Sequence, residues 1–247
     1  MTCRLCLKSV PLVNSHVVSE FLYGPLYDEK HRFHVISTNS EINDRLRQQG
    51  LYEKLLCRDC DGRILSGHEN YARGVLFGGQ PMLTAVDGNN LRQKGLKYAP
   101  LKLFYLSLLW RMSISRNEFY KNVSLGPHEE NIRRMLLASD PGPTDKYGLL
   151  CVAPVFDAQH VGDWMMPPDK TRAYGRTVYR CLIGGLLYCY FVGNSELPKP
   201  LRQHLLQDDG SWVIVRERVE KIPFLVDWCI EMGRAMQERQ GRLESKR

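Results

Sequence analysis

The sequence predicts an α+β protein in which a small zinc-bound unit precedes a mixed helical and β unit, and three observations support this fold class. Two Cys-x-x-Cys pairs lie within the first 60 residues. Residues 101–115 are apolar nearly all round a helix, as in a buried helix, and apolar residues recur with helical spacing in 219–239. Stretches rich in β-branched and aromatic residues cover 147–156, 177–192 and 211–216, which is typical of strands.

The composition is that of a globular protein that carries excess positive charge. The chain has 247 residues, of which 43% are hydrophobic and 25% charged, with a formal net charge of +7. Such a balance favours a polyanionic partner, either nucleic acid or an anionic membrane surface. Four of the eight cysteines are scattered among apolar neighbours, as in reduced intracellular proteins.

Two features of the sequence favour a cytoplasmic protein with no membrane partner. The N-terminal residues contain no apolar segment of the kind that secretory signals use. The longest apolar run, 182–192, is interrupted by two glycines and is far shorter than the ~20 residues of a membrane helix.

The predicted elements fall into two units joined by a linker. Residues 1–75 form the first unit, with strands at 12–18 and 33–36, a short capped helix at 40–49 and a longer helix at 57–73. Residues 76–98 are rich in Gly, Asn and Gln and are expected to be a linker. Residues 99–247 form the second unit, with helices at 101–115, 126–138 and 219–239 and the three strands named above.

The two cysteine pairs predict a structural Zn²⁺ site. A Cys-x-x-Cys turn points two sulfur atoms at one ion, and two such turns complete a tetrahedral shell of thiolates. The second pair leads into a helix, whose N-terminal dipole favours thiolate. The order of knuckle, hairpin and helix is that of a treble clef. The alternative, a redox dithiol, is disfavoured by the presence of two pairs; the expected ligands are Cys3, Cys6, Cys57 and Cys60.

One arginine lies inside the apolar helix expected at 101–115. Arg111 is flanked by Trp110 and Met112, so its guanidinium group is expected to be buried. A buried guanidinium needs a partner. We therefore expect Arg111 to pair with a carboxylate between the two units and not to contact a substrate.

Three short motifs of the first unit resemble one nuclease family. The sequences Cys-Arg-Leu-Cys, Ser-His-Val-Val-Ser-Glu-Phe and Leu-Leu-Cys-Arg-Asp-Cys-Asp are similar to those of HNH (ββα-metal) endonucleases, and to a bacterial subgroup in particular. The resemblance implies a metal-dependent endonuclease that hydrolyses phosphodiester bonds in DNA, in a setting such as antiphage defence. It also implies that His16 is the general base and that Asp61 lies near a catalytic Mg²⁺ or Mn²⁺.

Further residues are candidates for supporting roles in such a site. Ser15 stands where many HNH enzymes have a metal ligand. His68 and Glu69 lie seven and eight residues beyond Asp61, roughly 10–12 Å along a helix, so they are not expected to bind the same ion. They and Arg63 are expected to support the site or to face phosphates.

Departures from the family pattern leave a second hypothesis open. Ser15 replaces a ligand, Tyr52 stands where the middle Asn of the family often lies, and 18–19 replaces the usual Ile-Pro. Under this second hypothesis the first unit is a catalytically inactive zinc module that binds nucleic acid or a protein partner. In either case residues 99–247 are a candidate surface for a protein partner, as an assembly or effector-sensing domain.

Overall fold

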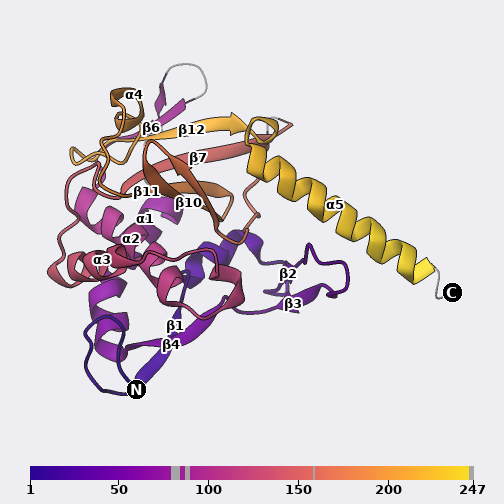
Figure 1. The fold of residues 1–247 in the computed structure, drawn as a ribbon, viewed down its shortest axis with the longest axis horizontal. Coiled ribbons are helices and arrows are strands. Elements are labelled where there is room, and N and C mark those ends of the chain that lie inside the picture. The colour runs from indigo at the N-terminus through magenta and orange to yellow at the C-terminus, as the bar shows by residue number, and fades with distance from the viewer. Residues whose placement is uncertain (79–83, 87–89, 158, 245–247) are drawn as a thin grey trace.

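The computed structural model is a mixed α+β protein, which confirms the predicted fold class at that level (Figure 1). It describes residues 1–78, 84–86, 90–157 and 159–244. A two-stranded hairpin and the helix that follows it lie at the N-terminal end of the chain. A large sheet, three further long helices and several short ones make up most of the remainder.

The N-terminal hairpin joins two strands that are far apart in the sequence. Strand β1 (Leu12–His16) pairs antiparallel with β4 (Tyr52–Cys57), so that His16 lies opposite Tyr52. A π-helical segment, η2 (Cys60–Leu65), follows β4 and continues directly into α1 (Ser66–Phe77). The predicted helix after Cys57 is confirmed, and its beginning is widened into the π form.

The segment between β1 and β4 contains a 3-10 helix, η1 (Glu20–Leu26), and a small hairpin of β2 (Phe33–Val35) and β3 (Arg45–Arg47). The prediction of a helix over 40–49 is wrong, because β3 lies within that stretch and pairs with β2. Hydrogen bonds to β2, available only in the folded chain, override the local capping signal.

The large sheet has the strand order β5-β6-β12-β7-β11-β10-β9, and β8 also pairs with β7. All neighbours are antiparallel except β12 and β7, which are parallel. The bounds are β5 (Thr84–Val86), β6 (Asn90–Gln93), β7 (Gly148–Phe156), β8 (Gln159–His160), β9 (Asp169–Ala173), β10 (Arg176–Ile183), β11 (Leu186–Val192) and β12 (Trp212–Arg218).

Two stretches of this sheet differ from the sequence prediction. The strand expected over 177–192 is a hairpin, because Gly184 and Gly185 both have positive φ, 57° and 74°, as a tight hairpin turn requires. Within 76–98 the described residues supply β5 and β6 to the sheet edge, and 79–83 and 87–89 lie outside the described residues.

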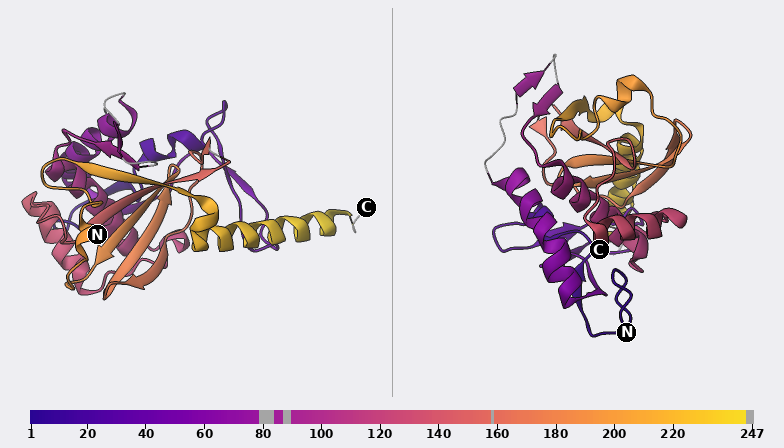
Figure 2. Two further views of the ribbon diagram at one scale, coloured as in Figure 1. Left: turned by 90° about the horizontal axis from the view of Figure 1, so that it is seen from above. Right: turned by 90° about the vertical axis from the view of Figure 1, so that its left-hand side faces the viewer.

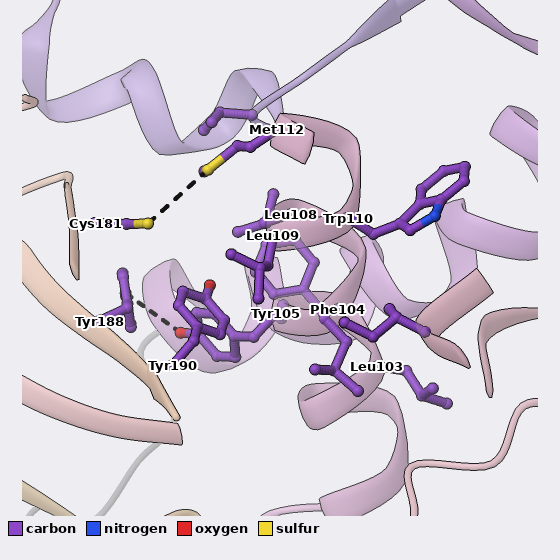
Figure 3. Close-up of a cluster of buried hydrophobic side chains, with 14 of the residues drawn as sticks. Leu103, Phe104, Tyr105, Leu108, Leu109, Trp110, Met112, Cys181, Tyr188 and Tyr190 are labelled. Atoms are coloured by element: carbon purple, nitrogen blue, oxygen red, sulfur yellow. Dashed lines mark hydrogen bonds between the residues drawn. The ribbon is translucent and has the colours of Figure 1, made fainter. Parts of the chain in front are cut away.

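Helix α2 (Tyr98–Ile114) packs between the sheet and two other helices, α1 and α3 (Pro127–Ala138). It is buried along nearly its whole length, which confirms the prediction for 101–115. Figure 3 shows Tyr105 of α2 beside Tyr188 of the sheet, and the centroids of these two rings are 4.7 Å apart. The Tyr105 ring also lies 5.5 Å from that of Trp212, between centroids.

One cluster of buried side chains extends from the N-terminal hairpin to the large sheet. It includes Leu56 on β4, Leu108 on α2 and Tyr190 on β11. The division of the chain into units at 75 and 99 stays a prediction, but the side chains on the two sides of it share this core.

The opposite face of the sheet is covered by a second cluster, which includes residues from η4 (Val219–Lys221) and the start of α5 (Pro223–Glu244). Helix α5 then projects beyond the sheet (Figures 1 and 2). Arg239 on α5 forms an ion pair with Asp44 in the β2–β3 connection. The remaining short helices are η3 (Glu118–Tyr120) and α4 (Lys199–Arg202). Within the described ranges, no helix combines the length and apolar character that crossing a bilayer requires.

Candidate functional site

The four cysteines of the two pairs converge on one point. Cys3 and Cys6 lie in the loop before β1, Cys57 ends β4 and Cys60 begins η2. Their sulfur atoms all lie within 4.8 Å of one another, and the Cys6 and Cys57 sulfurs are 3.9 Å apart. A Zn–S bond of about 2.3 Å places the corners of a tetrahedron about 3.8 Å apart. The geometry therefore fits a structural metal ion, as the sequence predicted.

Backbone groups hold this cluster in place. The Cys57 N–H donates to the Cys3 sulfur at 3.3 Å, and the Arg4 N–H donates to the Leu55 carbonyl at 3.0 Å, which fastens the N-terminal loop to β4. Burial raises the pKa of the Cys3 thiol, but backbone N–H groups more than offset it and leave the pKa at about 7. Burial and the neighbouring thiols raise the pKa of Cys60. A bound cation relieves this crowding of sulfurs by stabilising the thiolate forms.

His16 lies at the end of β1, and its side chain is 35% exposed. Its Nε2 is 2.9 Å from Oε2 of Glu20. Glu20 is fixed in turn, because the Tyr27 hydroxyl donates to Oε1 and the Gly50 N–H donates to Oε2 at 3.2 Å. A side chain at Gly50 would clash with the Tyr23 ring, so a glycine there lets the chain pass close enough to reach Glu20.

Sequence reasoning missed Glu20. It follows His16 by four residues, a spacing that would place the two side chains apart if the strand continued. The chain instead leaves the strand after His16 and enters η1 at Glu20, which brings the carboxylate back to the imidazole. The acidic residue in the first turn of a helix was the available signal.

Arg111 of α2 fixes the backbone of the strand end. The buried guanidinium donates through Nη1 to the His16 carbonyl at 2.8 Å, and its Nη2 lies 2.8 Å from Oε1 of Glu69 on α1. Ser19 completes the network, since its hydroxyl donates to the same Glu69 oxygen at 2.7 Å. The prediction that Arg111 pairs with a carboxylate is confirmed, and the carboxylate is that of Glu69.

Asp61 lies on η2 beside this network. Burial raises the pKa of its carboxyl, while the Ser15 hydroxyl and the charge of Arg111 oppose that shift. The Ser15 hydroxyl oxygen is itself buried without a hydrogen bond of good geometry. The candidates Ser15, His16, Asp61 and Glu69 thus come together around Arg111.

The other two candidates have different surroundings. Arg63 is exposed and forms an ion pair with Asp59 one turn earlier, 2.6 Å between Nε and Oδ1. Burial lowers the pKa of His68, whose Nε2 is buried without a hydrogen-bond partner. Among the described residues no hydrogen bond or ion pair joins either of them to Arg111, and roles for them at phosphates stay predictions.

An open depression of about 560 Å³ lies in front of His16 and Glu20. Tyr52, opposite His16 on β4, forms part of its wall, and the rings of the two residues meet edge to face with centroids 6.1 Å apart. Side chains from the segment between the two strands complete the lining: His31, Gln48 and Gln49, together with Asn14 of β1.

The described residues contain one set of three or more metal-ligating side chains that converge, and it is the four cysteines. A catalytic Mg²⁺ or Mn²⁺ at Asp61 therefore stays a prediction. Comparisons of the chain with protein-family models, curated proteins and solved structures found no match. The resemblance to HNH endonucleases accordingly rests on the motifs of the sequence.

Proposed function

We propose that this protein is a metal-dependent endonuclease of the HNH type that hydrolyses phosphodiester bonds in nucleic acid, most readily DNA, with His16 as the general base. The observation that carries the proposal is the arrangement of His16, which ends a strand at an open depression. Its ring is held by Glu20 and its carbonyl by Arg111.

The order of the elements supports the assignment to this family. A cysteine loop, two antiparallel strands and a helix follow one another around the candidate zinc site, with His16 at the end of the first strand and Asp61 on the helix. A treble-clef ββα-metal unit would have its elements in this order, which supports the proposal. The net charge of +7 supports a polyanionic substrate.

The chemistry assigned to His16 follows from its contact with Glu20. A carboxylate accepts and does not donate, so Nε2 carries the proton and Nδ1 is the nitrogen that can accept one. In the proposed reaction a water oxygen forms a bond to phosphorus and its proton passes to Nδ1 of His16. The P–O bond to the leaving oxygen breaks, and that oxygen takes a proton from solvent.

The residues around Asp61 can accommodate the divalent ion that such a reaction uses. Mg²⁺ typically needs one or two carboxylates, with waters and substrate phosphates completing its shell. Asp61 would supply the carboxylate, and the unsatisfied Ser15 hydroxyl lies beside it. When bound, the ion would stabilise charge on the phosphate and on the leaving oxygen.

A cleavage assay with matched histidine variants tests the proposal. Purified zinc-loaded protein would be incubated with supercoiled plasmid and with single-stranded oligonucleotides in Mg²⁺ or Mn²⁺. We expect the His16→Ala variant to lose cleavage at least 100-fold. The variant His34→Ala, which removes an exposed histidine of β2, should cleave like the native protein. Absence of metal-dependent cleavage by native protein, or equal rates for native protein and His16→Ala, would contradict the proposal.

A second function is favoured by two observations. The cysteines are the one convergent ligand set among the described side chains, and Tyr52 occupies the place of the middle Asn of the family. A zinc module that binds nucleic acid or a protein without cleaving it would have these features. Native protein that shifts a labelled oligonucleotide without cutting it in either metal would support this second function.

A further inference from the structure

We propose that the depression beside His16 binds an unpaired nucleobase of the substrate. This inference rests on the proposed function, since it names the part of a nucleic acid that the same site holds. The depression has a volume of about 560 Å³, which lies within the range of small-ligand pockets, about 300–1,000 Å³.

The side chains of the lining select the chemistry of the ligand. Three of them are amides, Asn14, Gln48 and Gln49. Each amide offers a donor and an acceptor, the pairing that recognises base edges. No lysine or arginine is part of the lining, and the Glu20 carboxylate is. A phosphate group inside the depression would meet this negative charge with no cation of the lining to neutralise it, so the interior suits a neutral group that forms hydrogen bonds. In the proposed reaction the scissile phosphate would lie outside it, on the Asp61 side of His16, where the divalent ion would neutralise its charge.

Aromatic rings supply the faces on which a base can stack. Tyr52 is 42% exposed and lies in the wall beside His16. The His31 ring stacks on Tyr27, with centroids 3.8 Å apart and planes 18° apart. Stacking on such rings is how proteins commonly hold unpaired bases, because every base has a flat face.

The backbone at His31 is built to keep this ring in place. His31 has φ of 54°, a left-handed conformation that a non-glycine residue adopts at a cost. Asp28 holds the turn, since Oδ1 accepts from the N–H groups of Lys30 at 2.9 Å and Arg32 at 2.8 Å. The His31 N–H donates to the Asp28 carbonyl at 2.9 Å. These hydrogen bonds fix the turn, so the imidazole of His31 is held at the pocket.

Positive charge lies next to the pocket and not inside it. Arg45 and Arg47 of β3 are exposed and lie on the same side of the strand, and Arg47 immediately precedes Gln48. Cations at this place can contact the phosphates that flank a base in the pocket. A base still paired in a duplex cannot enter a pocket, so the substrate class is single-stranded nucleic acid or a duplex with an extruded base.

Binding experiments without Mg²⁺ or Mn²⁺ test this inference independently of cleavage. Deoxynucleoside 5′-monophosphates and deoxyribose 5-phosphate would be titrated into isotope-labelled native protein, with the ring signals of His16, His31 and Tyr52 followed by NMR. We expect the nucleotides to shift these signals and the base-free sugar phosphate to leave them in place. Equal shifts from both ligands, or none from the nucleotides, would overturn the proposal.

A matched pair of tyrosine variants gives a second measurement. Tyr52→Ala should weaken the binding of a single-stranded oligonucleotide about tenfold, whereas Tyr174→Ala, which removes an exposed ring on the β9–β10 turn, should not change it. If native protein and Tyr52→Ala bound the oligonucleotide with equal affinity, that result would also overturn the proposal of a base-binding pocket. Nucleotide binding without any cleavage would support the base-binding pocket and contradict the nuclease proposal. His16-dependent cleavage without base binding would support the nuclease proposal and contradict the base-binding pocket.

Discussion

The cysteine cluster and the His16 depression lie at the two ends of the same hairpin, and they differ in how far their side chains are exposed to solvent. The cluster is closed: three of its four cysteines are buried, and backbone N–H groups orient the sulfurs. The depression is open, and the side chains of His16 and Glu20 at its base are 35% and 38% exposed.

This difference indicates that the closed cluster stabilises the fold, whereas the open depression is positioned by the fold. A closed tetrahedral shell has no position for a substrate, so an ion bound by the four cysteines would contribute to folding alone. The open site is positioned by other parts of the chain, above all by Arg111 of α2. Substitutions should therefore change the free energy of unfolding strongly at the cluster and weakly at the depression.

The largest loss of stability is expected at the cluster. Cys57→Ser removes one of four thiolates, and chelation removes the ion itself; each should destabilise the protein by several kcal/mol. Thermal unfolding and the zinc content of the purified protein measure the two effects together. Cys229→Ser, at a half-buried cysteine of α5, should leave both unchanged. Full zinc content in Cys57→Ser would contradict the four-ligand assignment.

The next largest effect is expected at Arg111 of α2, which contacts the His16 carbonyl and Glu69 on α1. Arg111→Met leaves Glu69 without its partner and should cost about 3 kcal/mol, as for other broken buried pairs. The double variant Arg111→Met/Glu69→Leu should recover part of that loss, because no unpaired charge remains. A double-mutant cycle in urea measures the coupling, and a coupling near zero would show that the ion pair does not join α1 and α2 energetically.

The sequence predicted the cluster well and the depression poorly, for a physical reason. Cys-x-x-Cys turns are local, so their spacing alone indicates which atoms converge. The contacts of Glu20 depend on the chain leaving the strand at once, and Gln48 reaches the same pocket from a stretch in which a helix was expected. For Arg111 the sequence indicated burial and a charged partner, but only the packing of α2 on α1 shows that the partner is Glu69.

Lys102 offers a contrast to Arg111 on the same helix. It is also buried, but its ammonium group donates to neutral oxygens, the Tyr98 hydroxyl at 2.7 Å and the Pro143 carbonyl at 2.6 Å. Burial lowers the pKa of Lys102 to about 7, from 10.5. Between these values the unfolded chain binds more protons than the folded one, so the free energy of unfolding should rise with pH.

The variant Lys102→Met tests that contrast. At pH 7 it should unfold with a free energy about 1–2 kcal/mol higher than the native protein, because a buried charge without a carboxylate partner is removed. The margin should narrow as the pH rises towards 10, where the native lysine is neutral in the folded state. Urea unfolding of both proteins at pH 7 and pH 9.5 measures it, and a margin independent of pH would contradict the lowered pKa.

The smallest change in stability is expected at Glu20, where the change in chemistry should be large. Glu20→Gln keeps the shape of the side chain and alters hydrogen bonds that are partly exposed, so it should cost less than about 1 kcal/mol. A glutamine amide can donate as well as accept, so a glutamine at this place no longer requires the proton of neutral His16 to be on Nε2.

The ¹⁵N chemical shifts of the imidazole should therefore report one tautomer in the native protein and a mixture of tautomers in Glu20→Gln. Cleavage should fall about tenfold or more through kcat with little change in KM. Tyr27→Phe, which removes a donor to the other oxygen of Glu20 and leaves the carboxylate, should retain the native tautomer. If Glu20→Gln instead lowered the free energy of unfolding as much as Cys57→Ser, the role of Glu20 would be structural, like that of the cysteines. An unchanged tautomer with unchanged cleavage would remove Glu20 from the site altogether.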